Sequence, residues 1–222
     1  MTVVYEERPS DSPFVQTIWH TVAESDGCDI VSADGSWDII VAKQEGQTRL
    51  YVWGAMTRAM HVPHCQGDEH LGIRFKPGTY LPSLPAKTLL NVGMTLPQSS
   101  PNKSFWLDSS TWQYPNYENA ETFISKLVHD DLLICDPVID GVLQGTISDL
   151  SLRSVQRHFL RATGLTHNVI RQIERARQAA LLLQQGVSIV NTVHQVGYAD
   201  QSHMTRALKQ FIGQTPAQIA HL

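Results

Sequence analysis

Short apolar runs separated by turn residues dominate the first part of the chain, a pattern typical of β-strands. The runs DIIVAK (38–43) and TRLYVWGA (48–55) lie on either side of Glu45-Gly46, and LGIRF (71–75) ends just before Pro77-Gly78. Glycine and proline at these breaks favour tight turns between strands. The pattern therefore predicts a β-rich barrel or sandwich for this part of the chain.

Two stretches that follow lack this alternation. Residues 97–119 are rich in Ser, Pro, Asn and Trp without clear periodicity, so we expect an ordered loop there. Residues 118–133 (ENAETFISKLVHDDLL) restore a helical pattern through Phe123, Leu127 and Leu133. They predict a helix that leads out of the β-rich domain.

From Ser151 onward the apolar spacing is helical, and polar caps and glycines mark the helix ends. Ser151 can cap a helix that ends at Gly164. The inner side of this helix is expected to carry Leu152, Val155 and Phe159.

A long helix is predicted next, from Thr166 to Gln185, stopped by Gly186. Its inner face comprises Val169, Ile173, Ala176, Ala180 and Leu183. At the end of the chain, Thr215-Pro216 combines an N-cap with a proline suited to the first helical position, which predicts one more short helix.

Two short helices joined by a glycine lie between these elements. Ser188 can cap the first, which ends at Gly197, and Asp200 can cap the second, which ends at Gly213. The inner positions are Ile189, Val193 and Val196 in the first helix and Met204, Ala207, Leu208 and Phe211 in the second. A short helix, a glycine turn and a second helix form the sequence pattern of a helix-turn-helix.

The outer face of the second helix carries polar residues at helical spacing. They are Gln201, Ser202, Thr205, Arg206 and Lys209. In a helix-turn-helix the second helix enters the major groove, where Gln and Arg can read base edges while Lys and hydroxyl groups suit phosphates. We therefore predict that this face binds DNA and is not merely a solvated surface.

The same layout occurs 49 residues earlier in the chain. The matched pairs are Ser151 with Asp200, Arg157 with Arg206, Phe159 with Leu208 and Gly164 with Gly213. Two recognition helices joined by one long helix would let a single chain contact two successive major-groove faces.

The supporting helix of the first unit departs from this repeat. The positions that match Ile189, Val193 and Val196 are Asp140, Gln144 and Ile147, and the breakers Pro137, Gly141 and Gly145 interrupt the stretch. We expect this helix to be short or displaced, and the first helix-turn-helix to be degenerate. Our hypothesis is that the second unit reads bases while the first holds the DNA backbone. The residues expected to hold the backbone are Arg153, Gln156, Arg157 and Arg161.

The charge of the chain divides at the same place. Residues 1–150 contain 9 Lys and Arg against 19 Asp and Glu, a balance of −10, whereas residues 151–222 contain 8 against 2, a balance of +6. A basic part joined to an acidic one indicates that only the basic part meets a polyanion. We expect a β-rich effector or dimerisation domain at 1–130 and a helical DNA-binding domain at 131–222.

The segment GYADQSHMTRALKQFIGQTP (197–216) resembles the second helix-turn-helix of the AraC/XylS family of bacterial transcription regulators. The residues that occur together at the family spacing are Gly197, Tyr198, Asp200, Arg206, Gly213, Thr215 and Pro216. SLRSVQRHFLRATGLT (151–166) resembles the end of the family's first unit. ADGSWDIIV (33–41) and GIRFKPGTYLPSLPA (72–86) resemble its cupin-like effector-type domain.

This resemblance implies an α+β chain of two domains, a β-rich barrel or sandwich followed by an all-α DNA-binding domain with two helix-turn-helix units. It implies promoter DNA and RNA polymerase as partners, often a homodimer, and activation or repression tuned by a small-molecule effector. The N-terminus lacks the apolar run of a signal peptide, and no window of the sequence matches a membrane span, so we expect a cytoplasmic protein.

The segment HVPHCQGDEH (61–70) concentrates possible metal ligands. Its candidates for binding zinc or another transition metal are His61, His64, Cys65 and His70. The spacing matches no established zinc motif, so we expect a polar loop between strands, with Cys65 buried and no resident metal. A metal-responsive regulator is the alternative. The other two cysteines, Cys28 and Cys135, are far from Cys65, which indicates reduced thiols.

Two tryptophans of the predicted strands, Trp37 and Trp53, either line a ligand pocket or belong to the core. No GxSxG, P-loop, GxGxxG or HExxH motif occurs, so no catalytic residue is predicted. Two further alternatives stay open at this point. One is a small β-barrel enzyme fused to a DNA-binding tail, and the other is a ligand-independent DNA-binding protein whose first part only dimerises.

Overall fold

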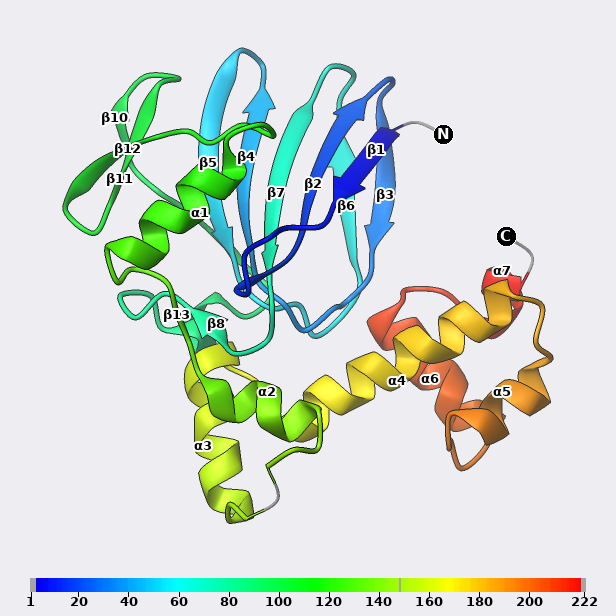
Figure 1. Ribbon diagram of the computed structural model, residues 1–222. Coiled ribbons are helices and arrows are strands. Elements are labelled where there is room, and N and C mark those ends of the chain that lie inside the picture. Colours follow the sequence, from blue (N-terminus) through cyan, green and yellow to red (C-terminus); the bar gives the residue numbers. More distant parts are fainter. Residues whose placement is uncertain (1–2, 148, 221–222) are drawn as a thin grey trace.

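A computed structural model describes residues 3–147 and 149–220 of the chain, with a β-rich part followed by a helical part (Figure 1). The centre of the β-rich part is an antiparallel six-stranded sheet in the order β1-β2-β7-β4-β5-β9. Its strands are β1 (Val3–Arg8), β2 (Val15–Ala23), β4 (Asp38–Gln44), β5 (Gln47–Trp53), β7 (Glu69–Phe75) and β9 (Gly93–Thr95).

The strands predicted from the apolar runs are confirmed as β4, β5 and β7. Glu45 and Gly46 form the two-residue turn between β4 and β5, both with positive φ (50° and 72°). Such a turn matches the twist of the flanking strands, and glycine adopts it without steric cost.

Three smaller antiparallel sheets accompany the central one. They are the pair β3 (Gly27–Val31) and β6 (Met60–His64), the pair β8 (Thr79–Tyr80) and β13 (Ile134–Cys135), and the meander β10 (Gln98–Ser100), β11 (Ser104–Leu107) and β12 (Ser110–Gln113). The prediction of a loop at 97–119 is therefore wrong, because the meander lies within it. The strands of the meander are only three or four residues long, which is too short to show an alternating pattern. Phe105 and Trp112 of these strands are nevertheless buried.

One face of the six-stranded sheet packs into the main core of the β-rich part. Ile18, Ile73 and Ile39 are paired across neighbouring strands and are almost fully buried. Helix α1 (Ala120–His129) covers this face together with the meander (Figure 1). The helix predicted from 118–133 is thus confirmed in a shorter form, with Leu133 buried beyond its end.

The helical part contains α2 and, after it, the capped helices predicted from Ser151 onward. They are α2 (Pro137–Leu143), α3 (Leu152–Thr163), α4 (His167–Gln184), α5 (Ile189–Gln195), α6 (Gln201–Phe211) and α7 (Pro216–Ala220). The side chains of Ser151, Thr166, Ser188 and Asp200 each accept a backbone N–H at the start of the next helix. The caps read from the sequence are therefore confirmed.

Helix α4 lies along the centre of the helical part and packs against α3, α5, α6 and α7 (Figure 1). Of its expected inner face, Ile173, Ala176, Ala180 and Leu183 are buried, while Val169 is only half-buried. On α3, Phe159 is buried as expected, but the expectation for Leu152 is wrong because its side chain is 88% exposed. Leu152 occupies the first position of the helix, before the turn that meets the core.

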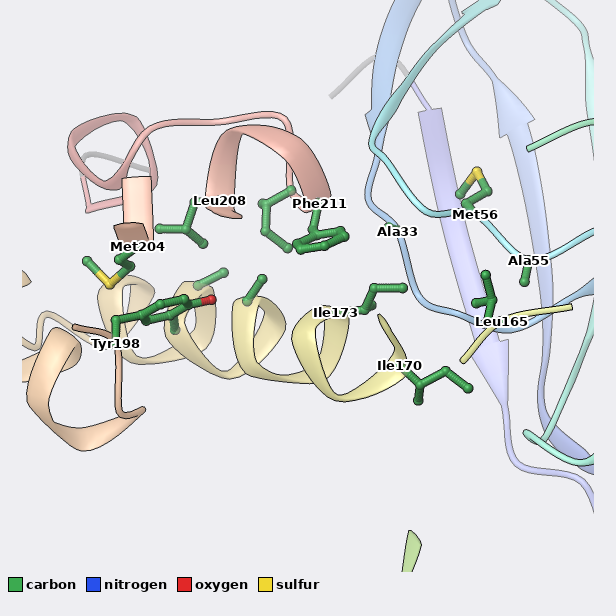
Figure 2. Close-up of a cluster of buried hydrophobic side chains, with 14 of the residues drawn as sticks. Ala33, Ala55, Met56, Leu165, Ile170, Ile173, Tyr198, Met204, Leu208 and Phe211 are labelled. Atoms are coloured by element: carbon green, nitrogen blue, oxygen red, sulfur yellow. The ribbon is translucent and has the colours of Figure 1, made fainter. Parts of the chain in front are cut away.

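A single cluster of buried side chains extends across both parts of the chain. Figure 2 shows it along α4, from Tyr198, Met204 and Leu208 at one end to Ala33 and Met56 of the β-rich part at the other. β13 pairs with β8, so the β-rich part continues to Cys135, just before α2. The division expected at residue 130 stays a prediction. No helix within 3–147 or 149–220 has the length and apolar character needed to cross a membrane.

Candidate nucleic-acid interface

Helix α6 presents the predicted DNA-binding face to solvent. Its inner residues Met204 and Leu208 are fully buried, and Phe211 is nearly so. On the opposite side, Gln201, Ser202, Arg206 and Lys209 are exposed and Thr205 is half-buried. Asp200 fixes the start of the helix, where its carboxylate accepts the His203 N–H at 2.7 Å. The structure therefore brings the predicted side chains together on one accessible face of the helix.

Two details of α6 differ from the pattern-based expectation. The Thr205 hydroxyl donates to the Gln201 carbonyl at 2.8 Å, so this hydroxyl is already engaged within the helix. His203 is exposed in the first turn and lies edge-on to the Tyr198 ring, 5.1 Å between ring centroids. His203 falls beside the i, i+3, i+4 series used to choose outer residues, which is why sequence analysis missed it.

The helix before α6 supports it from behind. In α5, Val193 is nearly buried, and Thr192 is fully buried with its hydroxyl donating to the Ser188 carbonyl at 3.0 Å. Gly197 ends the turn after α5 with φ +71°. Tyr198 then packs under the Arg175 guanidinium of α4, 5.5 Å from the ring centroid. The resulting unit has the layout of a helix-turn-helix with α6 as the recognition helix.

The first unit places a similar helix, α3, at the other end of α4. Arg153, Gln156, Arg157 and Arg161 are all exposed on it. The Arg161 guanidinium, however, lies over the buried Tyr80 ring, 5.4 Å from its centroid, at the contact with the β-rich part. Of the four side chains proposed to hold the DNA backbone, Arg161 is therefore partly engaged by the protein itself.

Helix α2 shows how the first unit departs from the repeat. It has seven residues like α5, but it begins and ends earlier, so residues 144–151 connect it to α3 where residues 196–200 suffice in the second unit. The expected displacement is confirmed, and the helix is no shorter than its counterpart. Gly141 packs closely against this connection, since a Cβ there would lie 2.4 Å from Ile147 Cδ1.

A hydrogen-bonded pair of side chains joins α2 to α3. The buried Asp136 caps α2, and its carboxylate also lies 2.6 Å from His158 Nδ1 of α3. α2 also packs apolar side chains inward, with Ile139 fully buried and Val142 and Leu143 against the same cluster.

Comparison with known proteins addresses this part of the chain. A family model described as a helix-turn-helix domain matches residues 146–221. These matched residues form an AraC-type helix-turn-helix domain. The chain is also 38% identical over 88 residues to the HTH-type transcriptional regulator RipA of Corynebacterium glutamicum, an alignment that covers 39% of this chain and 27% of RipA. No solved structure gives a significant match.

Each recognition helix of the helix-turn-helix domain ends at a left-handed glycine that touches the β-rich part. A Cβ at Gly164, after α3, would lie 2.9 Å from the Lys87 backbone in the 3₁₀ helix η1 (Ala86–Leu89). A Cβ at Gly213, after α6, would lie 2.7 Å from Ile30 Cγ2 and 3.0 Å from Ala59 Cβ. The end of each recognition helix is therefore packed closely against the β-rich part.

The second face of the six-stranded sheet borders a cavity of about 400 Å³. The ribbon of β3 and β6 forms another wall of it. Trp19 lies opposite Gly72 in the sheet and Trp53 lies opposite Gly93, and a Cβ on either glycine would fall within about 2.2 Å of the indole ring. Both rings thus lie flat over glycines and belong to the sheet face that borders the cavity.

A buried cluster of charges closes one end of this face. Arg74 Nε lies 2.9 Å from Asp34 and 3.2 Å from Asp38, so two carboxylates share one guanidinium. Burial raises the pKa of Asp38 to about 6, although Arg74 and the neighbouring Trp19 indole lower it in part. The same carboxylates raise the pKa of Arg74, so the guanidinium keeps its charge.

The two tryptophans singled out by sequence have different roles. Trp53 borders the large cavity, whereas Trp37 stacks on Phe75, with 4.0 Å between centroids, and donates to the Thr79 carbonyl. Sequence analysis missed Trp19, Asp38 and Arg74. Asp38 and Arg74 had a signal in the sequence, because charged residues within apolar strands are unusual. Trp19 had none, because its position over Gly72 depends on the pairing of β2 with β7.

The histidine and cysteine segment runs from β6 through a short turn into β7, two strands that belong to different sheets. His61 and Cys65 are exposed, so the expected burial of Cys65 is wrong. Asp68 is buried instead, and its carboxylate accepts the Cys65 N–H at 3.0 Å, which lowers the pKa of Asp68. Across the ranges that the structure covers, no three His, Cys, Asp or Glu side chains are grouped to hold a metal ion.

Replacing Gly72 by Ala should destabilise the β-rich part by about 1–3 kcal/mol, the usual cost of overpacking. The new Cβ would lie 1.9 Å from Trp19 Cε2, so the indole must leave the sheet face. Urea unfolding would measure the loss. In the double variant with Trp19→Val the penalty should largely disappear. Additive losses would show that the ring does not depend on this glycine.

Proposed function

We propose that this chain is a sequence-specific DNA-binding transcription regulator whose affinity for DNA depends on a small molecule held in the cavity of its β-rich part. The AraC-type helix-turn-helix domain and its basic charge support the DNA-binding half of this proposal. Promoter DNA and RNA polymerase are the partners that such a role implies, in a monomer or a homodimer.

The main support for control by a small molecule is the junction between α6 and the cavity wall. The last carbonyls of a helix have no partner within the helix. Here the Phe211 carbonyl accepts the Ala33 N–H at 2.7 Å, and the Gln210 carbonyl accepts the Ala59 N–H at 2.8 Å. Ala33 follows β3 and Ala59 precedes β6, the two strands of the ribbon that borders the cavity.

Side chains reinforce this junction. Met56 borders the cavity and also belongs to the buried cluster that contains Phe211 and Leu208. Asp34, next to Ala33, pairs with Arg74 at the cavity end. A ligand that shifts the ribbon or the Arg74 cluster would therefore act on the end of the recognition helix through short, buried contacts. Coupling energies of about 1–3 kcal/mol are typical of such links.

Selection from a random DNA pool with the full chain tests the proposal. We expect enrichment of a defined motif, with affinity falling steeply as salt increases, because phosphate contacts release counterions. A variant with Gln201, Arg206 and Lys209 changed to Ala is the control and should select no motif. A wild-type pool without enrichment would contradict DNA recognition.

Screening metabolites by thermal shift tests the regulatory half. A compound that stabilises the protein without being converted should change the affinity for the selected DNA. Turnover of the compound would favour an enzyme, and stabilisation without any change in DNA affinity would contradict ligand control.

A further inference from the structure

We propose that the cavity binds a small organic cation with N–H donors, such as an alkylammonium or arylalkylammonium ion. The inference rests on the proposed function, since it names the chemical class of the molecule that occupies the same cavity. It follows from the hydrogen-bond acceptors, the charges and the aromatic rings that border the cavity.

An unpartnered acceptor is the first argument. His64 borders the cavity and its side chain is only 6% exposed. Its Nδ1 lies 3.0 Å from the Ser25 carbonyl, which can only accept, so Nδ1 carries the proton in the neutral ring. In that ring Nε2 is an acceptor and has no hydrogen-bond donor among the residues described, since the Asp29 carboxylate 3.4 Å away can only accept. A buried acceptor of this kind calls for a donor from the ligand.

The charge of the cavity is the second argument. Asp29 Oδ2 lies 3.4 Å from His64 Nε2, so two acceptors face one position. Asp38 and Asp68 also border the cavity, and Arg74, already shared by Asp34 and Asp38, is the one Lys or Arg that does so among the described residues. His70 adds no positive charge at neutral pH, because burial lowers its pKa. The lining thus has excess negative charge.

Aromatic rings are the third argument. The indoles of Trp19 and Trp53 lie flat over Gly72 and Gly93, and Tyr51 occupies the same sheet face as Trp19. The face of an aromatic ring attracts cations, and its area suits an apolar body. An anion would meet these carboxylates without a free basic group, and a neutral apolar molecule would leave His64 Nε2 unpaired.

A series of three matched compounds tests the inference: 2-phenylethylamine, 2-phenylethanol and 3-phenylpropanoate. At equal millimolar concentration, the amine should raise the melting temperature of the full chain and quench its tryptophan fluorescence with saturation. The alcohol and the carboxylate should do neither. Equal or stronger binding of the alcohol or the carboxylate overturns the inference, and so does saturable binding of none of the three.

Asp29→Asn is the variant that tests the position of the cation. Asp29 is an exposed strand residue, so the fold should tolerate the change, and loss of one charge-assisted contact should weaken amine binding about tenfold. Asp11→Asn, an exposed change outside the cavity lining, is the control and should leave the affinity unchanged. Equal affinities for the two variants would overturn the inference.

The DNA assay separates this inference from the proposed function. If the selected DNA still binds and a compound other than an amine alters its affinity, the cation is excluded while ligand control stands. If an amine binds with the expected selectivity but DNA affinity stays constant, the cation site stands and ligand control fails.

Discussion

Arg206→Ala should weaken binding to the selected DNA by about 1–3 kcal/mol and relax sequence preference at one position of the motif, because a bidentate contact to guanine has this value. Arg206 is exposed on α6, and it makes no hydrogen bond or ion pair with any other residue that the structure describes. Its guanidinium is therefore free for a base edge. Affinity for the selected motif and for single-base variants would measure both effects.

Arg157→Ala, at the matching position of α3, is the comparison. It should weaken binding to all sequences by a similar factor and lower the salt dependence by about one ion, as expected of a phosphate contact. We expect this division of roles because α2 is displaced and because the Arg161 guanidinium already packs over the Tyr80 ring. If Arg157→Ala relaxes sequence preference as much as Arg206→Ala does, both units read bases.

The helical part could be predicted from the sequence because local chemistry decides it. Ser151, Ser188 and Asp200 each satisfy a backbone N–H that the helix leaves free, and Gly164 and Gly213 adopt positive φ. These signals depend on a few neighbouring residues, so they need no knowledge of the tertiary structure. The outer face of α6 followed directly from them.

The cavity could not be predicted in the same way because it depends on which strands pair. Trp19 and Gly72 are opposite each other only because β2 lies beside β7, and Asp38 meets Arg74 only because β4 lies on the other side of β7. Alternation along one strand gives two faces but does not say which face is buried. The contact of Ala33 with Phe211 likewise joins residues far apart in the chain.

Gly213→Ala should have a larger effect on stability than the same change at Gly197, although both glycines end helices with positive φ, +84° and +71°. A left-handed alanine costs about 1–2 kcal/mol at either position. At Gly197 nothing lies within 4 Å of the new Cβ, whereas at Gly213 it would press on Ile30 and Ala59. Overpacking should add about 1–3 kcal/mol there, measurable by chemical unfolding.

The same pair of variants tests how the cavity and α6 communicate. Separating Gly213 from Ile30 and Ala59 should lengthen the bonds from Ala33 and Ala59 to the end of α6, which are the shortest path from the cavity ribbon to the recognition helix. For a compound that alters DNA affinity in the wild type, the change should shrink toward onefold in Gly213→Ala and persist in Gly197→Ala. Wild-type regulation in both variants would mean that the signal travels by another contact, with Gly164 and Lys87 the next to be tested.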